Sequence, residues 1–196
     1  MRFWASASLA SMAIFCSASA AEAPPQPRTR SHRSNELTLA GLRPGRDTTA
    51  KAIRLYGKPD SLSPDHQSLN WAFEADAAFY LNLEVDKANV LQLVRVSRGP
   101  GPSGVNLPKH GAFFLRAWQS GRGLAAGALA SRVVELYGEP DSRSPSTKDG
   151  QQLELLYYAF DWAGADVPQV MEVLCTVAKG GKPGRVVEIT LAAPSL

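Results

Sequence analysis

Cysteine and histidine are scarce in this chain of 196 residues, which contains two cysteines and three histidines. The histidines, His32, His66 and His110, stand far apart, so no two of them have the close spacing of a helical or hairpin metal site. Cys16 lies near the N-terminus, and Cys175 alone cannot form an internal disulfide. We therefore expect no metal ion, no cofactor and a fold whose stability comes from packing.

A strong excess of charge of one sign is also lacking. The chain has 21 Lys and Arg against 18 Asp and Glu, a formal net charge of +3. Nucleic-acid-binding proteins have a clustered basic face, so a nucleic-acid partner is not expected. The local basic excess is Arg28–Arg33, within a Pro- and Ser-rich stretch. Either this stretch is a solvated leader, which the composition favours, or it touches a membrane through anionic lipid head groups.

Long apolar runs are missing as well, since a membrane span requires about 20 apolar residues. The N-terminal run Phe3–Phe15 is shorter and leads to Ala18–Ala20, the small-x-small pattern that a signal peptidase requires. We expect residues 1–20 to be a signal peptide cleaved near Ala20, with a retained anchor as the alternative. The mature protein is then periplasmic or secreted. Cys16 follows a phenylalanine rather than the small residue of a lipoprotein signal, so lipidation is not expected.

One seven-residue motif occurs twice. Leu55–Ser61 reads LYGKPDS and Leu136–Ser142 reads LYGEPDS, so six of the seven positions are identical. Such a match indicates that one structural unit occurs twice. Glycine followed by proline ends a helix, and the Asp that comes next accepts hydrogen bonds from turn backbone. The predicted turn residues are Gly57, Pro59, Asp60, Gly138, Pro140 and Asp141.

Each copy of the motif is preceded by a helical pattern and followed by three strand patterns. Alternation of apolar and polar residues, clearest in Phe79–Val85, predicts antiparallel strands with one buried face. We predict an α+β fold of two tandem repeats, each a helix or a helix pair packed on a small antiparallel β-sheet. The expected organisation is a signal peptide (1–20), a disordered Pro/Arg-rich spacer (21–36), a first repeat (37–98), a Gly/Pro linker (99–112) and a second repeat (113–196).

The order of these features resembles a known family. In both halves a helix ends in Leu-x-Gly-x-Pro, and a strand with aromatic residues such as Trp71 or Tyr158, a hairpin and a final apolar run follow. This pattern is similar to outer-membrane-assembly lipoproteins of the SmpA/OmlA (BamE) type and to the tandem β-lactamase-inhibitor-protein (BLIP) fold. The resemblance covers about residues 37–191. It implies a non-enzymatic binding module of the bacterial cell envelope or a secreted one.

Aromatic side chains crowd the predicted strands. If Trp71, Phe73 and Tyr158 lie on the buried face, Tyr80 and Tyr157 lie on the open one. Exposed tyrosines suit an interface with another protein; the alternative is that these rings pack on the linker or on the other repeat. We expect a protein partner to bind through these aromatic sheet surfaces, and no catalytic residue. The candidate contacts are Trp71, Phe73, Tyr80, Tyr157, Tyr158 and Trp162.

The alternative function is a periplasmic or secreted hydrolase that uses loop carboxylates. Glu74 and Asp76 lie at the end of one predicted strand, and Asp161 and Asp166 lie in the matching loop of the second repeat. Paired carboxylates can act as general acid and base or bind a hard cation. The spacing requires neither role, and solvated loop charges are the default.

Overall fold

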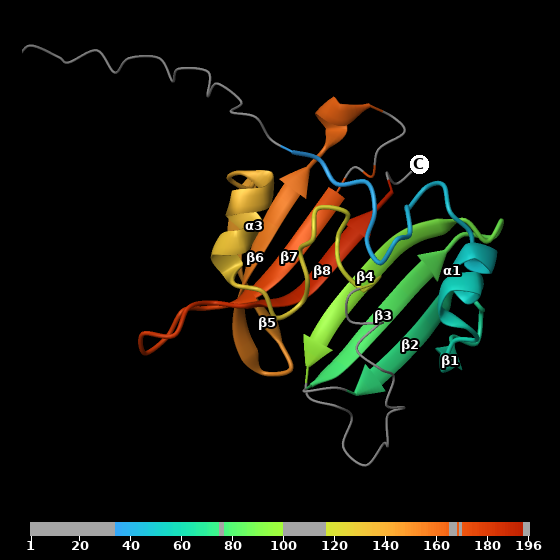
Figure 1. Cartoon of the computed structure of the whole chain (residues 1–196), viewed down its shortest axis with the longest axis horizontal. Coiled ribbons are helices and arrows are strands. Elements are labelled where there is room, and N and C mark those ends of the chain that lie inside the picture. Colours follow the sequence, from blue (N-terminus) through green and yellow to red (C-terminus); the bar gives the residue numbers. More distant parts are fainter. Residues whose placement is uncertain (1–33, 75–76, 100–116, 165–167, 169, 194–196) are drawn as a thin grey trace, which may run out of the picture. The chain divides into compact units, whose positions relative to one another are not determined.

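The computed structural model describes residues 34–74, 77–99, 117–164, 168 and 170–193 (Figure 1). The predicted signal peptide, Cys16, Arg28–Arg33 and residues 100–112 of the predicted linker lie outside these residues. The elements of the first half are α1 (Thr49–Tyr56), β1 (Ser61–Leu62), β2 (Ser68–Glu74), β3 (Ala78–Val85) and β4 (Leu91–Gly99). Those of the second half are α3 (Ala130–Tyr137), β5 (Ser142–Lys148), β6 (Gln151–Ala159), the short 3-10 helix η1 (Asp161–Ala163), β7 (Val170–Thr176) and β8 (Val186–Ala192).

All the strands belong to one eight-stranded antiparallel sheet, in the order β1-β2-β3-β4-β8-β7-β6-β5. The last strands of the two halves, β4 and β8, are neighbours at its centre, where Val94 lies opposite Leu191 and Val96 opposite Ile189. The prediction of two repeats, each a helix on its own small sheet, is therefore wrong, because the described chain is mostly β and has one continuous sheet. Unpaired, β4 and β8 would each expose a row of backbone N–H and C=O groups, and their pairing satisfies both rows.

The two helices are short and end in the same way. Gly57 has φ 79° and Gly138 has φ 80°, a backbone conformation that residues with a Cβ adopt only with strain. The Gly57 N–H donates to the Ile53 carbonyl and the Gly138 N–H to the Val134 carbonyl, each at 2.8 Å. Among the described residues, neither helix is long and apolar enough to cross a membrane.

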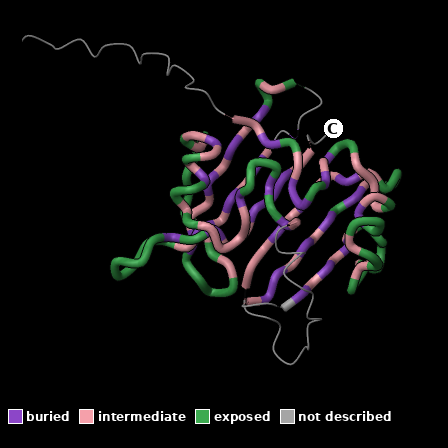
Figure 2. The backbone as a smooth tube through the Cα atoms, viewed as in Figure 1, coloured by how far each residue is buried: buried purple, intermediate pink, exposed green. Residues whose placement is uncertain are grey.

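Both helices pack on one face of the sheet. The Tyr56 ring of α1 meets Trp71 edge-on at 6.3 Å, and the Tyr137 ring of α3 lies 5.9 Å from Tyr158. Between the helices, two turns pair with each other and bring Leu39, Leu42 and Leu124 into the same hydrophobic core, each 0% exposed. Buried and half-buried residues alternate along the strands, so the core occupies this one face (Figure 2).

Glu36, the last residue of the predicted spacer, is buried at 3% exposure. Its Oε2 accepts from the Tyr137 hydroxyl at 2.6 Å and from the Arg122 N–H at 3.1 Å. Its Oε1 accepts from the N–H groups of Leu37 at 2.8 Å and Thr38 at 3.1 Å. A buried carboxylate is costly without such donors. Glu36 thereby fastens the segment before the first half to the helix of the second half.

Candidate functional site

The second face of the sheet, named the open face from here on, carries the side chains of opposite parity. One register row across it contains Asn70, Asn82, Arg95, Thr190, Glu172, Tyr157 and Ser142. The neighbouring row contains Ala72, Tyr80, Ser97, Glu188, Leu174, Leu155 and Ser144. Most of these side chains are half-buried, and the two described helices pack on the other face. The open face is therefore a broad sheet surface that neither described helix covers.

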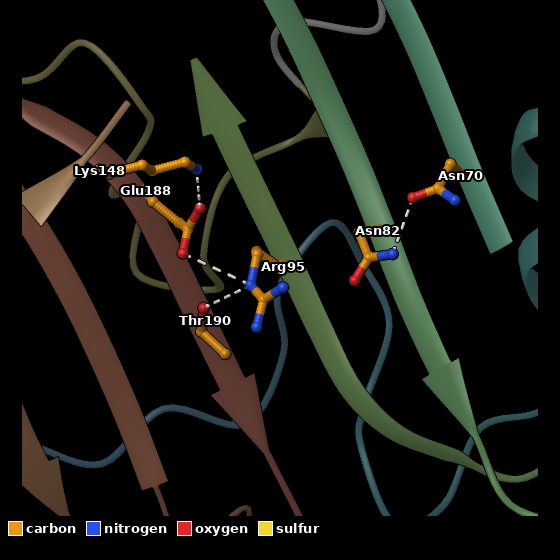
Figure 3. A network of polar contacts seen from close by, with 6 residues as sticks. All are labelled: Asn70, Asn82, Arg95, Lys148, Glu188 and Thr190. Atoms are coloured by element: carbon orange, nitrogen blue, oxygen red, sulfur yellow. Dashed lines mark hydrogen bonds and ion pairs between the residues drawn. The ribbon is translucent and has the colours of Figure 1, made fainter. Parts of the chain in front are cut away.

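An ion cluster lies at the centre of the open face (Figure 3). Glu188 Oε1 lies 3.4 Å from Arg95 Nε, and Glu188 Oε2 accepts a hydrogen bond from Lys148 Nζ. Arg95 Nε also donates to Thr190 Oγ1 at 3.3 Å. The Glu188 side chain is 12% exposed, so two cations neutralise one nearly buried carboxylate. Because Lys148 ends β5, the cluster joins the β5–β6 hairpin to the central strands.

An amide ladder continues the polar row toward the first edge of the sheet. Asn82 Nδ2 donates to Asn70 Oδ1 at 2.7 Å and to Ser68 Oγ at 2.9 Å. Figure 3 shows Asn82 on the strand next to Arg95, with Asn70 one strand further along. These hydrogen bonds hold the amides in place before any partner arrives.

Two half-buried tyrosines lie on either side of the ion cluster. Tyr80 is on β3, and burial raises the pKa of its hydroxyl. Tyr157 is on β6, three strands from Arg95 in the same register row, at strand spacings of about 4.8 Å. Tyrosine combines a large apolar ring with a polar tip, a common property of interface residues.

A pocket of about 420 Å³ opens beside Tyr80. Its lining includes the Leu153 and Val187 side chains and polar groups of Lys148 and Gln151. Apolar walls with a few polar groups suit one bulky side chain of a partner or one small ligand.

Three of the six predicted contact residues belong to the core. Trp71, Phe73 and Tyr158 are 5%, 1% and 0% exposed, so none can meet a partner in the folded protein. Trp71 Nε1 donates to the Gly57 carbonyl at 3.2 Å, and the Tyr158 hydroxyl donates to the Gly138 carbonyl at 3.0 Å. These two residues fasten the ends of the helices to the sheet.

The other three contact residues are accessible but are not together. Tyr80 and Tyr157 lie on the open face, as their parity predicts. Trp162 is 43% exposed and lies in η1, beyond the end of β6. The open face therefore contains only two of the six residues proposed from the sequence.

The predicted turn residues form the same contacts in both halves. Asp60 Oδ2 accepts from the Ala72 N–H, and Asp141 Oδ2 accepts from the Ala159 N–H, each at 2.8 Å. Asp60 thereby connects the turn after α1 to β2, and Asp141 connects the turn after α3 to β6.

The loop carboxylates do not form a described site. Asp76, Asp166 and the side chain of Glu74 lie outside the described residues, and Asp161 is exposed. Among the residues with described positions, no group of three or more His, Cys, Asp or Glu side chains is arranged to hold a metal ion. Cys175 is 0% exposed, and burial raises the pKa of its thiol to about 12, which suppresses nucleophilic chemistry.

The sequence reasoning missed the ion cluster. Arg95, Lys148 and Glu188 are distant in sequence, and Lys148 lies in a strand, SRSPSTK, that has no apolar alternation. The available signal was alternation, because Arg95 and Glu188 each lie between apolar residues, at positions that face away from the core.

No family model matches the chain, and no curated protein matches it in sequence. Solved structures that are similar to it include two bacterial proteins. One is YjgB, a DUF4309 family protein from Bacillus subtilis, with 12% identity, a TM-score of 0.44 and coverage of 82% of this chain and 88% of that chain. The other is a cysteine-rich secretory protein, SAV1118, from Staphylococcus aureus, with 11% identity, a TM-score of 0.41 and coverage of 82% and 48%.

Both TM-scores are too low to carry a conclusion on fold or function. Neither protein is described as a β-lactamase inhibitor or an outer-membrane-assembly lipoprotein, so the family resemblance expected from the sequence gains no support here.

Proposed function

We propose that this protein is an exported, non-enzymatic binding module of the bacterial cell envelope whose open face takes a polypeptide partner. One observation carries the proposal. Tyr80 and Tyr157 lie half-buried on a sheet face on which neither described helix packs, together with Leu93, Leu155 and Leu174. Aromatic and aliphatic side chains on a rigid surface are what a protein interface uses as anchors.

The polar groups of the open face also support the proposal that this face binds a polypeptide. Glu188 has both of its oxygens engaged by cations, and the Asn82 amide nitrogen has two acceptors, whereas the buried Asn82 Oδ1 has no hydrogen-bond partner among the described residues. Groups already satisfied within the protein cost less to cover than isolated charges. A partner can therefore cover the centre of the face while its own side chains contact the tyrosines and the pocket beside Tyr80.

Export rests on the N-terminal sequence. A positively charged start, a short apolar run and Ala18–Ala20 are the parts of a signal peptide. The hydrolase alternative depends on four loop carboxylates, of which Asp161 has a described side chain and is exposed.

To test the proposal, the chain starting at Ala21 is immobilised and used to capture proteins from an envelope extract. The Tyr80→Ser and Tyr157→Ser variants are compared with the unchanged protein. Trp162→Ser is the matched control, since it removes an exposed aromatic ring outside the open face. An interface anchor contributes about 2 kcal/mol, so each tyrosine variant should weaken a specific partner's binding roughly thirtyfold. Equal retention by the tyrosine variants, with unchanged melting, would refute the assignment of the surface.

A further inference from the structure

The outer surfaces of the two helices differ in charge although their backbones end alike. Aligned on the repeated motif, Arg54 corresponds to Glu135 and Lys58 to Glu139. Leu62 corresponds to Arg143 in the same alignment. At these three positions the first half has two basic side chains and a leucine, whereas the second half has two acidic side chains and an arginine.

The second half neutralises its charges internally. Arg132 lies 2.9 Å from Glu135, and Arg143 lies 2.9 Å from Glu139 and 3.6 Å from Glu154. Hydrogen bonding to Glu139 raises the pKa of Arg143. A groove of about 410 Å³ between α3 and the strands is thereby rimmed with paired charges.

Two cations of the first half, Arg54 and Lys58, have no ion pair with any described residue. Arg54 and Lys58 are exposed, and no acidic side chain of the described residues lies within ion-pair distance of either. The ion pair of α1 instead joins Lys51 to Asp47 at 2.6 Å. The two exposed cations thus have charge available for an external anion.

Three large aliphatic side chains accompany these cations. Ile53, Leu55 and Leu62 are 42%, 46% and 48% exposed. Ile53 and Leu55 flank Arg54 in the helix. In the motif alignment Ile53 corresponds to Val134 and Leu62 to Arg143, and both of these residues line one groove of the second half. By this correspondence Ile53 and Leu62 lie on the same side of α1.

We propose that Ile53, Arg54, Leu55, Lys58 and Leu62, named the α1 surface, dock on an anionic lipid surface. Aliphatic side chains enter the boundary between head groups and acyl chains while Arg and Lys remain with anionic head groups. The α1 surface is separate from the open face and does not depend on a protein partner there.

The composition favours lipid over an acidic protein. Protein interfaces are anchored mainly by Trp, Tyr and Arg in packed pockets, whereas the large apolar members of the α1 surface are all aliphatic. α1 also lies beside the β1–β2 end of the sheet (Figure 1). An exported protein meets anionic lipid at high density, which suits a weak contact of this kind.

Co-sedimentation with vesicles tests the proposal. The chain starting at Ala21 is mixed with vesicles of equal parts phosphatidylglycerol and phosphatidylcholine, or of phosphatidylcholine alone. We expect salt-sensitive binding to the anionic vesicles only. The double variant Arg54→Gln/Lys58→Gln should reduce it at least fivefold, since one basic residue near the surface contributes about 1 kcal/mol. Leu55→Ser should also weaken binding.

The matched control is Lys179→Gln/Lys182→Gln, which removes the same charge from an exposed turn far along the sequence and should leave binding nearly unchanged. Equal loss in this control would mean that only net charge matters, and would overturn the proposal. Loss confined to an Arg28→Gln/Arg30→Gln/Arg33→Gln variant would assign binding to the N-terminal segment and also overturn it. Binding to poly-glutamate without binding to anionic vesicles would overturn it in favour of an acidic polypeptide.

Discussion

The aspartates of the repeated motif illustrate what single residues contribute here. Asp60 accepts a hydrogen bond from a backbone N–H of β2, and Asp141 accepts one from a backbone N–H of β6, each at 2.8 Å. Each also donates its own N–H to that strand, to the carbonyls of Asn70 and Tyr157 at 2.8 Å. The identical residues of the motif therefore serve the attachment of a helix to a sheet rather than chemistry.

Asp60→Ala and Asp141→Ala should each lower the free energy of unfolding by about 1–2 kcal/mol, because an exposed charge-assisted hydrogen bond is lost. The Asn variants should lose less, since the side-chain carbonyl can still accept. Urea denaturation measures all four variants. An Ala variant as stable as the unchanged protein would mean that the bond contributes nothing.

Cys175 gives the protein a pH dependence at the alkaline end. Burial raises the pKa of its thiol from 9.0 to about 12. The unfolded thiol ionises first, so the stabilisation is complete below pH 9 and is lost as the pH rises toward 12, by at most about 1.4 kcal/mol per pH unit. Denaturation at a series of pH values should show a shallower decline for Cys175→Ala. An equally steep decline in this variant would assign the effect to other groups, including Tyr56, whose pKa burial raises to about 12.

At the scale of elements, the segment before the first half is held by the helix of the second. The Tyr137 hydroxyl donates a hydrogen bond to Glu36 Oε2 and forms a second hydrogen bond with Ser120 Oγ, each at 2.6 Å. Burial and the Glu36 carboxylate both raise the pKa of Tyr137, so its hydroxyl remains a donor.

Tyr137→Phe should destabilise the protein by about 2 kcal/mol, since the buried Glu36 carboxylate loses one of its donors. The double variant Tyr137→Phe/Glu36→Gln should be less than additive, because the two groups act on one another. Urea denaturation of the unchanged protein, the two single variants and the double variant measures this coupling. Strictly additive effects would show that the contact contributes no stability.

Most elements could be predicted from the sequence, but two edge strands could not. Strict alternation predicted a strand over Phe79–Val85, one residue shorter than β3, and the predicted glycine stops Gly57 and Gly138 directly follow α1 and α3. β1 has two residues, and β5 is exposed along most of its length and contains Pro145, so neither shows the apolar period that marks a strand. Edge strands of this kind are stabilised by pairing with a neighbouring strand, and the local amino-acid sequence does not show that pairing.

At the scale of the whole molecule, the pairing of β4 with β8 decides the architecture. Alternation shows that one face of a strand is buried but does not identify its neighbour, so two separate sheets and one continuous sheet give the same pattern. The same limit applies to the open face. Parity predicted Tyr80 and Tyr157 there, whereas the ion cluster depends on a hairpin that the sequence does not indicate.

A continuous core should unfold as one unit. Val94, Val96, Ile189 and Leu191 are at most 1% exposed across the β4–β8 pair. Calorimetry should therefore give a single transition with equal calorimetric and van't Hoff enthalpies. Val96→Ala should lower its midpoint without splitting it, at a cost of about 2 kcal/mol. Two separate transitions would show that the halves are independent.

The proposed function requires that the open face be the contact surface for another protein. Photo-cross-linking in the native envelope tests this most directly, with benzoylphenylalanine replacing Tyr157 on the open face or Leu129 beside α3, which is 41% exposed. The account predicts a discrete protein adduct from position 157 and none from position 129. Absence of an adduct at position 157, or the same adduct from both positions, would contradict it.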